Sequence, residues 1–101
     1  MCSNYERSVL KVLNEFDAWI PRSFLDVNEV LGSSVVNRLA LDGVSLRTFV
    51  QDLEDNKFLW VCQPGTIRTR KFVLTGLGLS SRRYFKEQVA ADEVVNGAIS
   101  A

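Results

Sequence analysis

The chain has 101 residues, of which 47% are hydrophobic and 24% are charged, with two prolines and two cysteines. This composition predicts one compact domain and excludes a disordered tail, a collagen-like fibre and a disulfide scaffold. Basic and acidic side chains cancel to a net charge of zero, and no uncharged apolar stretch approaches the roughly 20 residues of a membrane-spanning helix.

The first predicted element is a helix that begins at a capping box, Ser3-Asn4-Tyr5-Glu6. Pro21 disfavours helical backbone at the residue before it, so the helix should end near Ala18. Apolar residues recur at three- and four-residue spacing and predict one buried stripe. The stripe consists of Tyr5, Val9, Val12, Leu13, Phe16 and Ile20.

Two short helices are expected between Pro21 and Gly43. Ser23-Phe24-Leu25-Asp26 resembles a second capping signal and predicts a helix over residues 24–31. The next helix should cover residues 34–41 and bury Val35, Val36, Leu39 and Ala40. Asp42-Gly43 then provides the pair of residues that ends a helix and turns the chain.

A third helix follows with Ser45 as its N-cap, and Leu46, Phe49, Val50 and Leu53 form its buried face. Asn56-Lys57 closes it. Residues 58–63 are rich in aromatic and β-branched side chains and predict a strand that Pro64-Gly65 ends. Residues 66–71 read as a polar, basic turn, and residues 71–74 as the returning strand of an antiparallel hairpin.

The last predicted helix runs from about Ser80 to Val95, with Asn96-Gly97 as its stop. We therefore expect a single domain over residues 1–97 and a frayed tail over residues 98–101. The spacing of the large aromatic residues predicts core positions for them, not a base-stacking platform. They are Trp19, Trp60, Phe72, Tyr84 and Phe85.

Chemistry-bearing motifs are few. The chain has no histidine, which removes Ser-His and Cys-His nucleophilic sites and the usual Cys/His zinc sites. Acidic neighbours such as Glu54-Asp55 are adjacent on a predicted helix and do not face one another as a catalytic pair would. We expect no enzymatic activity, no metal ion and no cofactor.

The two cysteines and the N-terminus bear on the compartment. Cys2 and Cys62 lie 60 positions apart without a partner motif, which favours reduced thiols. Cys62 should pack as a small apolar group in its strand. The N-terminus lacks a basic region followed by an apolar one. We expect a cytoplasmic protein without a membrane partner.

The charge becomes informative when it is resolved along the chain, because an electrostatic field acts locally. Residues 64–88 carry six basic side chains against Glu87 alone, whereas every other segment is acidic. By itself this imbalance is as consistent with chance as with a binding surface. Its position on the predicted hairpin and last helix favours a binding surface.

The order of these elements, helices followed by a basic hairpin and a last helix, resembles the winged helix-turn-helix domain. Residues 39–49 (LALDGVSLRTF) resemble its turn and the start of its recognition helix. Residues 53–59 (LEDNKFL) resemble the passage into the first wing strand, and residues 72–78 (FVLTGLG) the step from the wing into the final helix. The resemblance covers residues 39–78 and implies an α+β, mostly helical fold of winged-helix type with a C-terminal hairpin wing. About ten extra residues between Pro21 and Ser34 depart from the simplest pattern.

In such a domain the recognition helix, here about residues 45–56, lies in the major groove of double-stranded DNA. Its exposed N-terminal side chains, Arg47, Thr48 and Gln51, would reach base edges, and Ser45 a phosphate. Arg47 can donate to guanine as a fork, and Gln51 can pair with adenine. A solvated helix face is the alternative for these residues, and Asp52, Glu54 and Asp55 argue against DNA at this helix.

The wing, residues 64–71, combines cations with hydroxyl groups that can bind phosphate oxygens or enter a minor groove. Strand alternation would place Arg68 and Arg70 on one face. An edge hairpin kept soluble by charge is the alternative. The wing residues assigned to DNA binding are Thr66, Arg68, Thr69, Arg70 and Lys71. Arg82, Arg83 and Lys86 would either extend a phosphate track or form a solvated helix face.

The resemblance implies a sequence-specific regulator that represses transcription by occupying an operator. A homodimer through the N- and C-terminal helices would allow two half-sites to be read. The predicted contact comprises Tyr84, Gln88, Ala91 and Val95.

A winged-helix protein-interaction module without DNA binding is the alternative function. Salt dependence separates the two. Phosphate contacts from Arg47, Arg68, Arg70 and Lys71 predict a log-log slope of about −3.6 per subunit, and a protein partner predicts a much weaker dependence.

Overall fold

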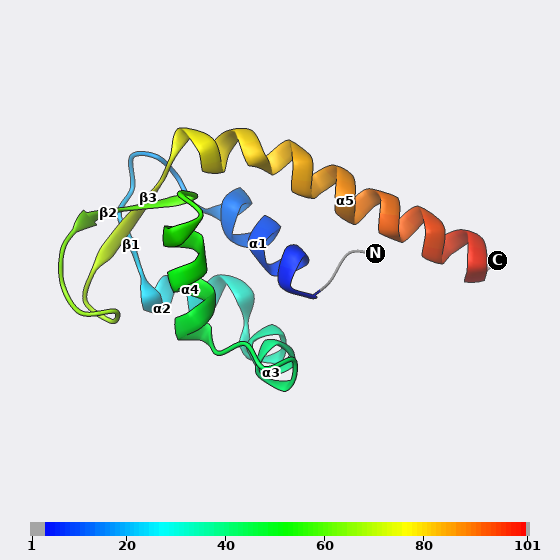
Figure 1. The fold of residues 1–101 in the computed structure, drawn as a ribbon, viewed down its shortest axis with the longest axis horizontal. Coiled ribbons are helices and arrows are strands. Elements are labelled where there is room, and N and C mark those ends of the chain that lie inside the picture. Colours follow the sequence, from blue (N-terminus) through cyan, green and yellow to red (C-terminus); the bar gives the residue numbers. More distant parts are fainter. Residues whose placement is uncertain (1–3, 101) are drawn as a thin grey trace.

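The computed structural model describes residues 4–100, and the side chains of residues 4–92. Within this range the fold is α+β and mostly helical, with five helices and a three-stranded antiparallel sheet (Figure 1). The helices are α1 (Asn4–Glu15), α2 (Phe24–Leu31), α3 (Ser33–Leu41), α4 (Leu46–Asp55) and α5 (Gly76–Ser100). The strands are β1 (Arg22–Ser23), β2 (Leu59–Gln63) and β3 (Lys71–Leu74).

Helix α1 ends at Glu15, earlier than the predicted Ala18. Its end is fixed by groups far away in sequence, because the Arg82 guanidinium donates to the carbonyl oxygens of Leu13 and Phe16. The amide of Leu74 binds the carbonyl of Asp17 just beyond. The apolar stripe is buried up to Phe16, whereas Ile20 is exposed, against the prediction. Ser3 of the predicted capping box lies outside the described residues.

Helix α2 has the predicted bounds and a complete capping box between Ser23 and Asp26. Helix α3 begins one residue before the prediction, directly after Gly32, whose φ of 83° permits the abrupt change of direction. Leu39 of α3 is fully buried and Val35 and Val36 pack against the core, but Ala40 is exposed, against the prediction.

The sheet has the order β1-β3-β2, so the returning strand of the hairpin lies in the middle. Strand β3 has the predicted bounds, whereas β1 was not predicted because two residues are too few to show alternation. A bulge between Val61 and Gln63 leaves Cys62 as an extra residue. Cys62 is therefore exposed, and its predicted burial is wrong.

Helix α5 begins at Gly76, before the predicted Ser80, because the Thr75 hydroxyl accepts the amide of Gly78 and caps the helix. It also continues through the predicted stop at Asn96-Gly97 to Ser100. Residues 98–100, assigned to a tail from the sequence, are thus helical, and residue 101 lies outside the description. Figure 1 shows α5 running along one side of the domain and beyond α1.

Two arginine contacts hold α5 to α1. Arg82 binds the end of α1, with 2.8 Å between Nη2 and the Phe16 carbonyl oxygen. Arg7 of α1 pairs with Asp92 of α5 at 2.6 Å, and only 8% of the Asp92 side chain is exposed. Arg82 is therefore part of the helix packing and does not continue a basic track on the surface.

The core is aliphatic and phenylalanine-rich, and three of the large aromatic residues are outside it. Phe16, Phe49 and Phe72 are fully buried. Leucines and valines of helices α1 to α4 and leucines of strands β2 and β3 complete the core, and α5 contributes no fully buried side chain among the described residues. Trp19 is 88% exposed, Trp60 64% and Tyr84 57%, so their predicted core positions are wrong. No helix among the described residues is long and apolar enough to cross a membrane.

The packing of the first turn of α5 gives a stability prediction. A Cβ atom at Gly78 would lie 2.5 Å from the carbonyl oxygen of Phe58 and 2.6 Å from Cδ1 of Leu74. Because the backbone carbonyl cannot move freely, Gly78→Ala should lower the free energy of unfolding by about 1–3 kcal/mol in urea denaturation.

Gly76→Ala is the matched control, since a Cβ atom there would meet nothing within 4 Å. We expect it to be neutral or to stabilise by less than about 1 kcal/mol. Equal effects of the two substitutions would contradict the close approach of Gly78 to the Phe58 carbonyl and the Leu74 side chain.

Candidate nucleic-acid interface

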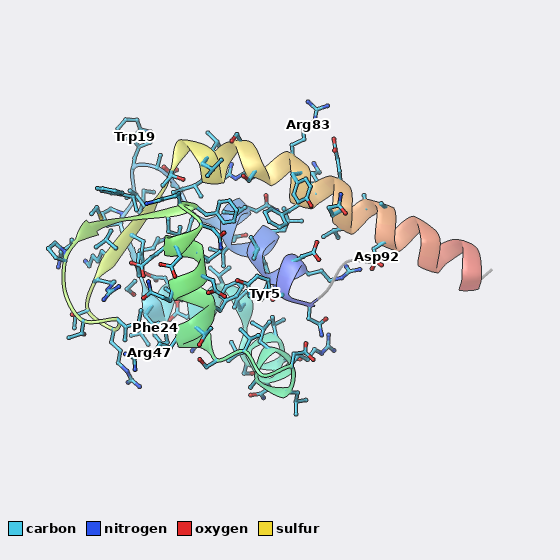
Figure 2. All side chains as sticks on the ribbon, in the orientation of Figure 1. Tyr5, Trp19, Phe24, Arg47, Arg83 and Asp92 are labelled. Carbon is cyan, nitrogen blue, oxygen red and sulfur yellow. The ribbon has the colours of Figure 1, made fainter. Side chains whose placement is uncertain are left out.

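The start of α4 and the hairpin tip, residues 64–70, lie on the same side of the domain, and α5 lies on the other (Figure 1). Figure 2 places Arg47 at the lower edge of the view and Arg83 at the upper edge, beyond α5. Most residues that the sequence assigned to DNA binding are thus presented on one side by two elements.

Ser45 caps α4 as predicted, because its hydroxyl oxygen accepts the amide of Thr48 at 3.1 Å. Its own hydrogen is directed to the Thr48 hydroxyl at 2.9 Å. Both side chains are exposed. Gly43, with φ of 83°, turns the chain from α3 into this cap, and its positive φ favours glycine. The amides of Leu46 and Arg47, ahead of the capped Thr48, have no partner within the helix.

Arg47 is exposed and forms no hydrogen bond or ion pair within the described part of the chain. Gln51, one turn further on, donates from Nε2 to Oδ1 of Asp55 at 3.0 Å. Such an exposed pair, one helical turn apart, contributes only a few tenths of a kcal/mol, so the Gln51 amide remains available to another partner at little cost.

Each acidic side chain of α4, which argued against DNA, has a partner, and two of the three have it inside the domain. Asp52 accepts the Tyr5 hydroxyl at 2.8 Å, and Asp55 accepts Gln51. Glu54 pairs with Arg70 of the hairpin tip at 3.1 Å. Only 9% of the Glu54 side chain is exposed. The charge of Glu54 is thus compensated by a cation and Asp52 is directed to α1, whereas Asp55 keeps its charge on the exposed surface beside Gln51.

Tyr5 ties α1 to α4. Its ring packs edge-on against Phe49 with 5.3 Å between centroids, and its hydroxyl reaches Asp52. Burial, and then the hydrogen bond and negative charge of Asp52, raise the pKa of Tyr5 well above its ordinary value. The hydroxyl therefore stays protonated and holds α4 against α1.

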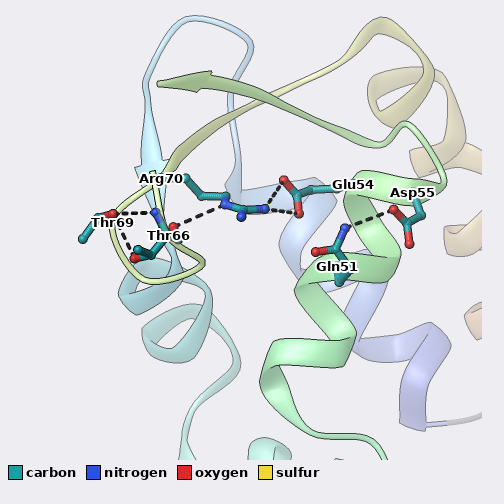
Figure 3. A network of polar contacts seen from close by, with 6 residues as sticks. All are labelled: Gln51, Glu54, Asp55, Thr66, Thr69 and Arg70. Atoms are coloured by element: carbon teal, nitrogen blue, oxygen red, sulfur yellow. Dashed lines mark hydrogen bonds and ion pairs between the residues drawn. The ribbon is translucent and has the colours of Figure 1, made fainter. Parts of the chain in front are cut away.

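The hairpin tip is closed by its own hydrogen bonds (Figure 3). The Thr66 amide donates to the Thr69 hydroxyl at 2.9 Å, and the two hydroxyls lie 3.0 Å apart. One hydroxyl hydrogen of the pair is used between them, so one remains for a phosphate oxygen. Gly65 permits this closure, because a Cβ atom there would lie 2.5 Å from Oγ1 of Thr69.

Arg68 and Arg70 do not share a face of the hairpin as predicted. They belong to the closed tip and not to a strand, since β3 begins at Lys71. Arg68 is exposed without a partner among the described residues, as is the Lys71 side chain. Arg70 is only 24% exposed and points to Glu54 of α4 (Figure 3).

Sequence reasoning missed the roles of Tyr5 and Glu54. Each bonds across the fold, Tyr5 to a residue 47 positions away and Glu54 to one 16 positions away. No local pattern signals either contact. The only available sign was that Asp52 and Glu54 flank the buried position Leu53 and so require partners.

The remaining basic residues of the C-terminal block lie on α5. Arg83 pairs with Glu87 one turn away on the exposed side of that helix, and Lys86 is exposed. Among the described residues, no group of three or more metal-ligating side chains is gathered in one place. No family model, curated protein or solved structure matches the chain.

The contact between Tyr5 and Asp52 predicts a pH-dependent stability. Tyr5→Phe should lower the free energy of unfolding by about 1 kcal/mol near neutral pH, because a hydrogen bond to a charged acceptor is lost. A raised pKa means that the folded protein retains a proton that the unfolded chain releases above about pH 10. Wild-type stability therefore falls as the pH rises above about 10, and the difference between wild type and Tyr5→Phe shrinks.

Urea denaturation near pH 8 and near pH 11 measures this difference. Tyr84→Phe is the control, because Tyr84 is exposed on α5 and its hydroxyl has no partner among the described residues. A difference between wild type and Tyr5→Phe that is constant with pH would contradict the role of the Tyr5 proton.

Proposed function

We propose that this protein is a winged-helix double-stranded DNA-binding protein that represses transcription by occupying an operator. Helix α4 serves as the recognition helix in the major groove, and the β2–β3 hairpin is the wing. Helices α3 and α4, joined through Gly43, form the helix-turn-helix, and α2 accounts for the extra residues that precede it.

The arrangement of the elements supports this proposal. A short strand precedes the helix-turn-helix, and the two strands of the hairpin follow it. The return strand β3 pairs with both β1 and β2, which ties the wing to the loop after α1. This order agrees with the sequence resemblance over residues 39–78.

The observation that carries the proposal is the distribution of uncompensated charge. Arg47, Arg68 and Lys71 are exposed without a partner among the described residues, whereas Glu54 is paired with Arg70 and Asp52 with the Tyr5 hydroxyl, which leaves Asp55 as the exposed acid of α4. Although the net charge of the chain is zero, this side presents cations from two elements. Cations on the helix and on the hairpin can bind the phosphates on either side of a groove, and the recognition helix can then enter the groove between those phosphates.

The exposed side chains at the start of α4 can read bases in this placement. Arg47 donates as a fork to guanine, and Gln51 pairs with adenine once it leaves Asp55. Ser45 and the first amides of α4 bind a phosphate. Thr66 and Thr69 together offer one hydroxyl hydrogen to the backbone.

A homodimer through α5 is part of the proposal, because one recognition helix reads only a few base pairs. Tyr84, Gln88 and Ala91 are exposed at helical spacing on α5, and the side chain of Val95 lies outside the described residues. The apolar stripe of α1 is occupied by the core, so α5 alone supplies the contact.

One observation favours the alternative, a protein-interaction module. Trp19 and Leu79 line a shallow depression of about 220 Å³ together with Ala18, Leu74, Asp17 and Arg82. Ile20 and Leu77, also exposed, are their sequence neighbours. In Figure 2, Trp19 lies at the edge of the view opposite Arg47, so a protein bound there would leave α4 and the wing exposed.

An amide-resolved NMR titration of the labelled protein with a short duplex at low salt tests the proposal. Shifts concentrated at residues 45–51 and 66–71 and reversed by salt are expected. Unchanged spectra at high duplex concentration would reject DNA binding and favour the protein-interaction module.

Single substitutions separate base reading from backbone contact. Arg47→Ala should cost about 1–3 kcal/mol of binding free energy and relax the base preference. Arg68→Ala should weaken binding to all sequences alike. Arg83→Ala is the control, because Arg83 lies on the side of α5 away from Arg47, and it should change the binding free energy little (Figure 2). Competition binding with base-substituted duplexes measures these effects, and a loss of preference only with Arg68→Ala would reverse the two roles.

The salt dependence should reflect two phosphate contacts and not four, because Arg70 is occupied by Glu54 and Arg47 reads a base. Contacts from Arg68 and Lys71 predict a log-log slope of about −1.8 per subunit. Fluorescence anisotropy over a salt series measures the slope, and a value near zero would exclude a phosphate-dominated interface.

A further inference from the structure

The ion pair between Glu54 and Arg70 is more enclosed than the exposed pair on α5. Nη1 of Arg70 lies 3.2 Å from Oε1 and 3.1 Å from Oε2 of Glu54. The side chains are 24% and 9% exposed, against 88% and 64% for Arg83 and Glu87. Reduced contact with water strengthens the attraction and makes loss of either partner costly.

The same guanidinium also holds the hairpin tip (Figure 3). Nε of Arg70 donates to the carbonyl oxygen of Thr66 at 3.3 Å. That oxygen also accepts the amides of Thr69 and Arg70 at 3.1 and 2.9 Å. Arg70 therefore links the carbonyl on which the tip closes to a carboxylate on α4.

We propose that Arg70 is a positioning residue that fixes the wing relative to the recognition helix, and not a DNA contact. Through Glu54 it sets where Arg68 and Lys71 lie relative to Arg47. This inference rests on the proposed DNA-binding function and revises one residue of it. It gives Glu54, an acid beside a DNA-binding surface, a role in binding DNA.

Nη1 and Nε of Arg70 are already used, and a phosphate that reached Nη2 would lie beside the Glu54 carboxylate, whose charge offsets that of Arg70. Moving Arg70 fully onto a phosphate would leave this carboxylate largely enclosed without its cation, close to a second negative group. Arg68 and Lys71 can bind phosphates without breaking any described contact. The energetic balance therefore favours these two side chains as the phosphate contacts of the wing.

Glu54→Gln tests the proposal because the two roles of Arg70 predict opposite signs. If Arg70 binds phosphate, the substitution frees it and removes a negative charge near DNA, so binding tightens and the salt slope steepens by about 0.9. If Arg70 positions the wing, the substitution loosens it and binding weakens without a steeper slope. The cost of ordering the loosened tip on DNA predicts a loss of about two- to tenfold.

Asp55→Asn is the matched control. It removes the same charge from the neighbouring position of the same helix, where the carboxylate contacts Gln51 and not the wing. We expect Asp55→Asn to bind DNA equally or more tightly than the wild type. Opposite directions for the two variants would exclude a simple charge effect.

The free protein provides a second measurement. Amide relaxation and hydrogen exchange of residues 66–71 should show a more mobile tip in Glu54→Gln, with the rest of the domain unchanged. Tighter DNA binding, a steeper slope or an unchanged tip would overturn the proposal. A wild type that binds no duplex, with a tip loosened by Glu54→Gln, would instead reject the proposed function and retain the link between tip and helix.

A thermal melt checks that Glu54→Gln remains folded. Arg70→Lys is the alternative should it unfold, because lysine keeps the charge but cannot donate to Glu54 and to the Thr66 carbonyl in one planar group. We expect the same weaker binding without a change in slope. Binding equal to the wild type with an unchanged tip would overturn the proposal.

Discussion

The burial of one face of α4 imposes the constraint on which the rest of the arrangement depends. Phe49, Val50 and Leu53 are almost completely buried, and each such side chain contributes about 1.5–3 kcal/mol to folding. Asp52 and Glu54 flank Leu53, so the burial that fixes the helix also draws two carboxylates toward the interior. Partly buried charges need partners, and Tyr5 and Arg70 supply them from two different elements.

The parts of the fold that follow from neighbouring residues could be predicted from the sequence. The capping box at Ser23, the cap at Ser45 and the strand from Lys71 to Leu74 were predicted because a few consecutive residues determine them. The early end of α1 could not be predicted, since it depends on Arg82, more than sixty positions away. The exposure of Trp19 and of Cys62 likewise depends on a loop and a bulge that only the folded sheet creates.

The candidate interface, too, could be predicted only in part. Basic residues that are close in the sequence need not lie on one surface of the folded domain. The basic residues 68–86 form one block in the sequence, but the fold separates them. Arg70 and Arg82 hold the hairpin tip and α1, and Arg83 and Lys86 lie on α5, on the far side of the domain. Arg68 and Lys71 remain, and they are joined by Arg47, which the sequence places in an acidic segment.

That the contact at Glu54 is an ion pair also matters for the proposed function. An apolar contact between the hairpin tip and α4 would hold the two together, but it is non-directional and would tolerate sliding. Two carboxylate oxygens on one guanidinium nitrogen, with a further nitrogen of the same planar group on the Thr66 carbonyl, fix direction as well as distance. Tyr5 of α1 holds α4 through Asp52. The orientation of α4 is therefore fixed relative to α1, and the orientation of the hairpin tip is fixed relative to α4. The proposed function places cations from two elements on one phosphate backbone and so requires this relation between them, because the spacing of the phosphates is set by the DNA.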